Sequence, residues 1–210
     1  MGLVCVLSDS DVFQVAFGIA RIYDEQLEDF TTATAYYLES LEVLKAIAVD
    51  STAWDACMRV TTLGALALCF EKTCAKRVAL SAREQPKKAE QYFEQAIAAY
   101  EAHCDQSAAS PDPESDDEDE EGEGEDEDEE VVEYEDVSES EIAFLADLNS
   151  AAAILFYHYG GNLLDQERWE GARDAMEHAL TLAENSSMAP EELDDLQQSI
   201  HDIWLEMETE

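Results

Sequence analysis

The chain has 210 residues, 46% of them hydrophobic, which is enough for one compact domain or a short helical array with a sizeable core. Four prolines and eight glycines favour helices over a β-sandwich. A formal net charge of −40, from 51 acids against 11 bases, argues against nucleic acid and anionic membranes as partners and favours basic proteins.

No run of 18 apolar residues is present, so no membrane-spanning helix is expected. The first residues, MGLVCVLSDSDVF, lack the basic start of a signal peptide, and Asp9 and Asp11 follow the apolar run at once. The five cysteines form no CxxC pair, which indicates reduced thiols rather than a metal site. We therefore expect a protein of the nucleus and cytoplasm.

Apolar residues at helical spacing dominate the chain before residue 105. Four helices are expected there, over residues 11–23, 31–49, 53–80 and 87–103. The first is expected to bury a stripe made of Val12, Val15, Ala16, Ile19, Ile22 and Tyr23. The second is expected to bury Ala33, Tyr37, Leu41, Leu44 and Ala48. Thr52 and Asp55 resemble a capping box before the third.

Residues 105–137 interrupt this pattern with an acidic segment. From residue 105 to residue 139 there are 20 acids and no base, and residues 115–130 contain only acids besides Ser115, Gly122 and Gly124. The segment has too few apolar residues to offset the entropy of ordering, so we expect it to be disordered. It is either a solvated loop that aids solubility or a segment that attracts Lys- and Arg-rich client proteins electrostatically.

If the segment attracts a basic client, its acidic residues are expected to bind that client. Tyr134 is expected to add a hydrophobic anchor. The set is Asp116, Asp117, Glu118, Asp119, Glu120, Glu121, Glu125, Asp126, Glu127, Asp128, Glu129, Glu130 and Tyr134. Ser115 and Ser138 are each followed by acids and are expected phosphorylation sites for an acidophilic kinase.

Helical spacing resumes after the acidic segment. Three helices are expected over residues 141–164, 168–184 and 191–207, and Ser138 with Glu141 forms a capping box before the first. The last is expected to bury Leu193, Leu196, Ile200, Ile203 and Trp204. The chain thus divides into residues 1–104 with two helix pairs, the insertion 105–137, and residues 138–210 with a third pair and a C-terminal helix.

The third pair carries a pattern of small and large residues at fixed offsets. Its sequence reads Phe156-x2-Tyr159-Gly160-x2-Leu163 and then Ala172-x3-Met176-x2-Ala179. This resembles the tetratricopeptide repeat (TPR), a stacked helix-pair architecture. The second pair matches in part, with Leu63-Gly64 and Ala89-x3-Phe93-x2-Ala96. The first matches more weakly, with Ile19-Ala20-x2-Tyr23 and Ala33-x3-Tyr37-x2-Ser40. The fold class expected is therefore all-α, a TPR-like α-solenoid of antiparallel helix pairs.

A TPR-like array with an acidic tract resembles the interrupted-TPR histone chaperones, the nuclear autoantigenic sperm protein family. That resemblance implies a helical C-terminal segment and a histone client. The placement differs, because the tract here falls between the second and third pairs. A second resemblance is to the fungal enhancer-of-translation-termination family, through the internal acidic tract and the sequence GNLLD at residues 161–165.

We expect a non-catalytic, acidic chaperone or adaptor for a basic client, a histone or a ribosomal protein. The alternatives are a regulator of translation termination or nuclear transport, and a structural subunit of a large assembly with an incidental acidic loop. No Gly-rich phosphate loop, nucleophile elbow or HExxH motif suggests an enzyme, and no cofactor, metal, nucleic acid, membrane or small-molecule substrate is expected.

Two further groups of residues are notable, a cluster of basic residues and the three tryptophans. Six bases fall within 17 residues and form either a solvated helix face or a docking patch for the acidic segment; they are Lys72, Lys76, Arg77, Arg83, Lys87 and Lys88. The three tryptophans, Trp54, Trp169 and Trp204, are expected to pack in the core.

Overall fold

The computed structural model describes residues 8–47, 53–76, 85–108 and 139–209, and every regular element within these ranges is helical. The elements are α1 (Asp9–Arg21), the π-helical turn η1 (Ile22–Gln26), α2 (Phe30–Ile47), α3 (Ala53–Lys76), α4 (Gln85–Ala108), α5 (Glu139–Leu164), α6 (Trp169–Glu184) and α7 (Pro190–Thr209). The expected all-α architecture is confirmed.

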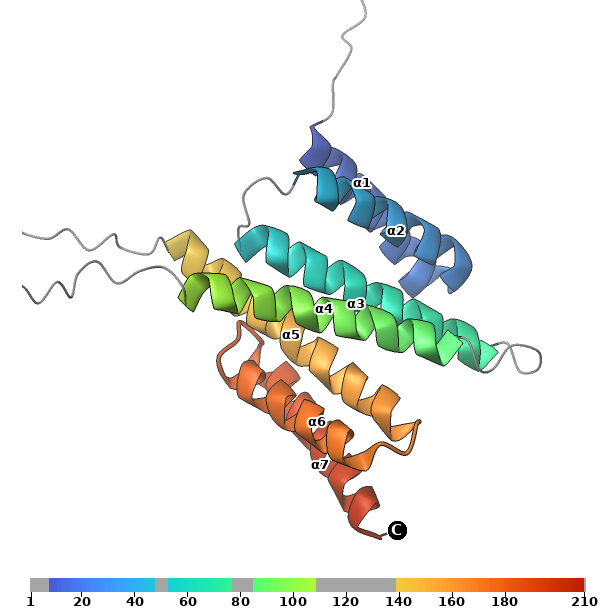
Figure 1. Ribbon diagram of the computed structural model, residues 1–210, viewed down its shortest axis with the longest axis vertical. Helices are drawn as coiled ribbons and strands as arrows, with labels where there is room; N and C mark the ends of the chain where they lie inside the picture. Colours follow the sequence, from blue (N-terminus) through green and yellow to red (C-terminus); the bar gives the residue numbers. More distant parts are fainter. Residues whose placement is uncertain (1–7, 48–52, 77–84, 109–138, 210) are drawn as a thin grey trace, which may run out of the picture.

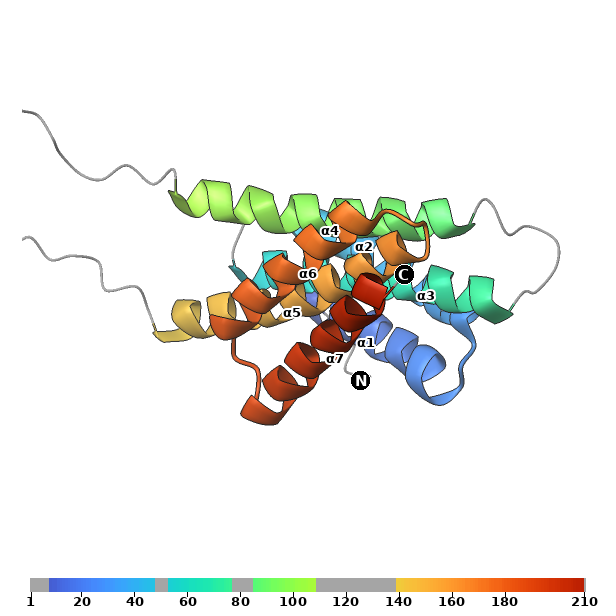
Figure 2. The same cartoon turned by 90° about the horizontal axis from the view of Figure 1, so that it is seen from below.

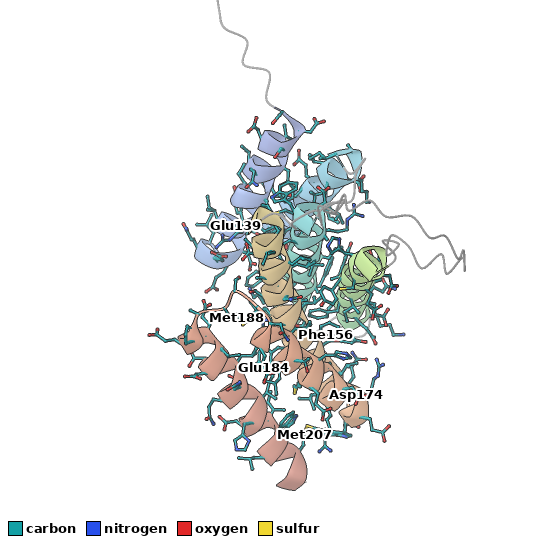
Figure 3. All side chains as sticks on the ribbon, turned by 90° about the vertical axis from the view of Figure 1, so that its left-hand side faces the viewer. Glu139, Phe156, Asp174, Glu184, Met188 and Met207 are labelled. Carbon is teal, nitrogen blue, oxygen red and sulfur yellow. The ribbon has the colours of Figure 1, made fainter. Side chains whose placement is uncertain are left out.

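The helices form three stacked pairs, α1 with α2, α3 with α4 and α5 with α6, and α7 packs on α6 (Figure 1). α3 also contacts α2 and α5, so it joins the first pair to the third. Two further views show α1 and α7 on the same side of the molecule and α4 on the opposite side (Figures 2 and 3). The array therefore has an inner side, flanked by α1 and α7, and an outer side formed by α4 and α6.

The small and large residues of the repeat pattern lie where pairs pack together. Those with at most 2% of their surface exposed are Ala20, Ala33, Tyr37, Ser40, Ala89, Phe93, Ala96, Leu163, Ala172, Met176 and Ala179. Ala residues at these positions let two helices approach closely, and the large side chains fill the space between them. The pattern read from the sequence thus predicts the core of all three pairs.

Two glycines mark the closest helix contacts. A Cβ atom on Gly160 would lie 2.9 Å from Cγ of Met176 and 3.2 Å from the carbonyl oxygen of Ala172, so α5 and α6 touch at this point. A Cβ atom on Gly64 would lie 3.3 Å from Cδ1 of Leu155, which is a contact between the second and third pairs. Glycine suits position 160 because even the Cβ atom of alanine would have to displace Met176 or separate the helices.

Helix boundaries follow local signals. Ser8 caps α1 in a capping box with Asp11, whose carboxylate accepts the Ser8 backbone N–H at 3.0 Å. The turns after η1 and after α5 each contain a residue in the left-handed region, Glu28 at φ 49° and Glu167 at φ 60°. After α5, the N–H of Arg168 donates to the carbonyl of Leu163 at 2.9 Å, which closes the helix end.

The structure corrects several sequence expectations. The buried stripe of α1 is Phe13, Ala16 and Ala20, whereas Val15 and Ile22 are about half exposed. Neighbouring stripes of α1 are equally apolar, so spacing alone does not select the face that meets α2. α4 continues to Ala108, so the expected acidic insertion begins after that residue and not at Asp105.

The three tryptophans differ in how they pack. Trp54 lies edge-on to Phe13 with ring centroids 5.9 Å apart, and Trp204 packs against the core of the third pair. Trp169 is 43% exposed, so the expectation of core packing is wrong for it. As the first residue of α6 it precedes the stretch that packs on α5, and only later residues of α6 face the core.

Candidate protein-binding surface

The expected client-binding and phosphorylation residues lie outside the described residues. They are Ser115, residues 116–121, residues 125–130, Tyr134 and Ser138. The C-terminal end of α4 and the N-terminal end of α5, on either side of this segment, lie at the same end of the molecule (Figures 1 and 2). Ala48, Thr52, Arg77 and Arg83 also lie outside the described residues.

Three adjoining cavities follow the inner side of the array, and we call them together the inner groove. The first, of about 280 Å³, lies among α1, η1, α2, α3 and α5, and Phe93 of α4 also lines it. The second, of about 230 Å³, lies among α3, α5 and α7, and the third, of about 470 Å³, lies between α5 and α7. His158 of α5 lines all three cavities. The groove is therefore continuous from the first pair to the C-terminal helix.

Both basic side chains of the first cavity are paired with acids of η1. Arg21 Nε lies 2.8 Å from Glu25 Oε1, and Lys72 Nζ lies 2.8 Å from Asp24 Oδ1. Asp24 is buried, and Lys72 also lies 5.4 Å from the centroid of the Phe30 ring. Lys72 thus joins α3 to the first pair and belongs neither to a free basic face nor to a docking patch.

The rest of the groove is acidic. Glu71 and Asp165 line the second cavity, and Glu192 and Asp195 line the third. Asn162 Nδ2 donates a hydrogen bond of 2.6 Å to Glu71 Oε1. Burial nevertheless raises the pKa of Glu71. No ion pair neutralises these four carboxylates among the side chains that the structure describes.

Apolar and aromatic groups lie beside these acids. Ile154 is 47% exposed and lines the first and third cavities, and Tyr157 lines the second and third. Burial, and secondarily the charge of Lys72, lowers the pKa of His158, so its imidazole is neutral at pH 7. The groove can therefore hold an apolar side chain at Ile154 and cationic side chains at the carboxylates next to it.

Sequence reasoning did not single out Glu71 or Ile154, and Asp165 entered it only as the last residue of GNLLD. Glu71 and Asn162 are 91 residues apart in the chain, and only the packing of α3 on α5 brings them together. Ile154 belongs to an apolar run in α5, where spacing does not separate buried from exposed residues.

Other kinds of site find no counterpart in the described residues. They contain no group of three or more His, Cys, Asp or Glu side chains placed to hold a metal ion. Cys57, Cys69 and Cys104 are free thiols there, and burial raises the pKa of Cys69 to about 12. No helix within those residues is sufficiently long and apolar to cross a bilayer.

A sequence model of a tetratricopeptide-repeat family matches residues 78–112, which include all of α4. The chain is TPR-like. The match lies in the second pair, although the residue pattern had indicated the third pair as the most specific. No curated protein and no solved structure matches the chain, so neither closer resemblance gains support from a relative. Stacked TPR-like helix pairs of this kind form scaffolds for protein–protein interaction.

Proposed function

We propose that this TPR-like scaffold is a non-catalytic chaperone or adaptor that binds a basic client protein, such as a histone or a ribosomal protein, in its inner groove. The observation that carries the proposal is the uneven charge of the groove. Its two basic groups are paired internally, whereas Glu71, Asp165, Glu192 and Asp195 have no cationic partner among the described side chains. A client with Lys and Arg side chains supplies that partner.

Charge and shape have separate parts in the proposal. The net charge of −40 attracts a basic protein over a distance and speeds association. The acidic residues 115–130 contribute many weak contacts, which salt screens. The inner groove adds a contact with a defined shape, since Ile154 offers exposed apolar area beside the acids.

The test is calorimetric titration of the full chain with core histones and with a basic ribosomal protein, at about 0.1 M and about 0.3 M salt. Ile154→Ser should weaken binding by about fivefold, because a half-exposed Ile that a client covers contributes on the order of 1 kcal/mol. Ile142→Ser is the matched control, since Ile142 is 57% exposed on the same helix and lines none of the three cavities. Equal affinities for the two variants would refute binding in the groove.

Deletion of residues 115–130 separates the contribution of charge. The variant should bind either client more weakly and with a flatter dependence on salt, and it should keep the helical fold because these residues contribute nothing to the apolar stripes of the sequence. Unchanged affinity for every basic client would leave these acids a solubility role only.

Two regulatory features belong to the same proposal. Phosphate on Ser115 adds negative charge to the acidic segment. Phosphate on Ser138 lies just before α5, where the helix dipole favours an anion. Mass spectrometry of protein isolated from its own cells should find one of the two phosphorylated. A fluorescent fusion should distribute between nucleus and cytoplasm, where histones and ribosomal proteins are made and used.

A further inference from the structure

A second acidic cavity lies on the outer side of the array, and we call it the outer cleft. It has a volume of about 310 Å³ and lies among α4, α5 and α6. Phe156 and Asp174, which line it, lie on the side of the molecule that carries α4, away from Met188 and α7 (Figure 3). The outer cleft is therefore distinct from the inner groove.

Aromatic rings form one wall of the outer cleft. The rings of Phe156 and His178 stack with centroids 5.3 Å apart at an interplanar angle of 28°. Tyr159 lies beside them and its ring is 5.8 Å from that of Phe93. Flat aromatic surfaces favour a planar guanidinium, which can stack on a ring face while its edges donate hydrogen bonds.

A guanidinium of the chain itself is already bound on α4, one helical turn from this cleft. Arg168, in the turn before α6, pairs with Glu90 of α4. Glu94 lies one helical turn beyond Glu90 on the same face of α4. An arginine thus pairs with this face of α4, and Glu94, the next carboxylate along it, has no ion pair among the described side chains.

Three carboxylates of the outer cleft lack such a partner among the described side chains. Glu94 and Glu101 line it from α4, and Asp174 lines it from α6. Arg173, next to Asp174 in the sequence, does not line the cleft. Glu94 and Glu101 are roughly 10 Å apart along the helix axis, a distance that about three residues of an extended peptide span.

The carboxylates of α4 and α6 therefore select a cationic ligand by charge complementarity.

We infer that the outer cleft is a second binding site, for an arginine-rich segment of the client. One guanidinium lies between Glu94 and Asp174 against the Phe156–His178 rings, and a second reaches Glu101. The inference rests on the proposed function, because it assumes a basic client. It adds that the client contacts both sides of the array and that arginine is recognised by geometry as well as by charge.

The test uses the full chain and a capped arginine octapeptide as the probe. The triple variant E94Q/E101Q/D174N removes three charges from the outer cleft. The matched control D9N/E39Q/E184Q removes three charges from exposed residues that line none of the described cavities. Calorimetry at about 0.1 M salt should show roughly tenfold weaker binding for the cleft variant and less than about twofold for the control. Circular dichroism checks that both variants keep the fold.

Equal losses for the two triple variants would overturn the inference, since binding would then follow net charge alone. The proposed function would stand in that case, because Ile154→Ser tests the inner groove separately. A wild-type chain that binds neither the peptide nor a basic protein would overturn both. In ¹H–¹⁵N spectra the peptide should shift the amide signals of Glu94, Ile97 and His178, and shifts confined to α1 and α7 would also overturn the inference.

Discussion

Gly160 of α5 faces Met176 of α6 so closely that a Cβ atom on residue 160 would lie 2.9 Å from the Met176 Cγ. This contact sets the distance between the two helices of the third pair. The carbonyl of Ala172 lies only 3.2 Å from the same point, so backbone as well as side chain limits the space. The glycine of the repeat pattern is thus explained by the helix partner it touches.

Gly160→Ala should lower the free energy of unfolding by about 1–3 kcal/mol, because the added methyl group must displace Met176 or separate the helices. Gly161→Ala is the control on the same helix, since no atom lies within 4 Å of its Cβ position. It should raise stability by about 0.5–1 kcal/mol through helix propensity. Urea denaturation of both variants measures the difference, and equal stabilities would contradict the close contact.

Lys72→Met should destabilise the chain by about 1.5–3 kcal/mol, because it leaves the Asp24 carboxylate buried without its cation. The Asp24 side chain is only 8% exposed. Lys45→Met removes an ion pair with Glu42 in which both side chains are more than half exposed. That change should cost at most about 0.5 kcal/mol. Thermal melts of both variants provide the measurement. Adding Asp24→Asn to Lys72→Met should restore part of the lost stability.

Glu71→Gln should stabilise the fold at pH 7, and the gain should shrink as the pH falls. Burial raises the pKa of Glu71 in the folded chain above its value of 4.5 in the unfolded chain, so the folded chain binds the proton more readily. The stability that Glu71 contributes below pH 4.5 is therefore lost as the pH rises through the folded pKa. Glutamine stays neutral at every pH and still accepts the Asn162 hydrogen bond. Melting temperatures between pH 4 and pH 7 test this, and Glu39→Gln, at an exposed residue, should show no such trend.

Glu167→Gly should raise stability by at most about 1 kcal/mol, because Glu167 has φ 60° and glycine adopts this conformation without steric cost. The entropy of glycine in the unfolded chain offsets part of the gain. Glu170→Gly, three residues later in the first turn of α6, should instead lower stability by about 0.5–1 kcal/mol. If the two variants melted at the same temperature, the strain at residue 167 would be negligible.

Much of the fold could be read from local spacing. The bounds of α5, α6 and α7 agree with the expected helices to within a few residues, because apolar periodicity and Pro190 act within one or two turns. Ala33, Tyr37 and the alanines of the repeat pattern are buried as predicted. Val15 and Ile22 were assigned to the wrong face because α1 has more apolar residues than one stripe requires.

The sequence by itself determined that the chain is helical, TPR-like and strongly acidic, since composition, periodicity and the repeat pattern are local properties. Only the tertiary structure decided which acids remain without a cation. Lys72 lies 48 residues from Asp24 in the chain and Arg168 lies 78 residues from Glu90, so neither pairing could be read from spacing. Helix stacking neutralises Asp24 and Glu90 and leaves Glu71, Glu94 and Asp174 beside cavities, because a charge is paired only where packing places a base within reach.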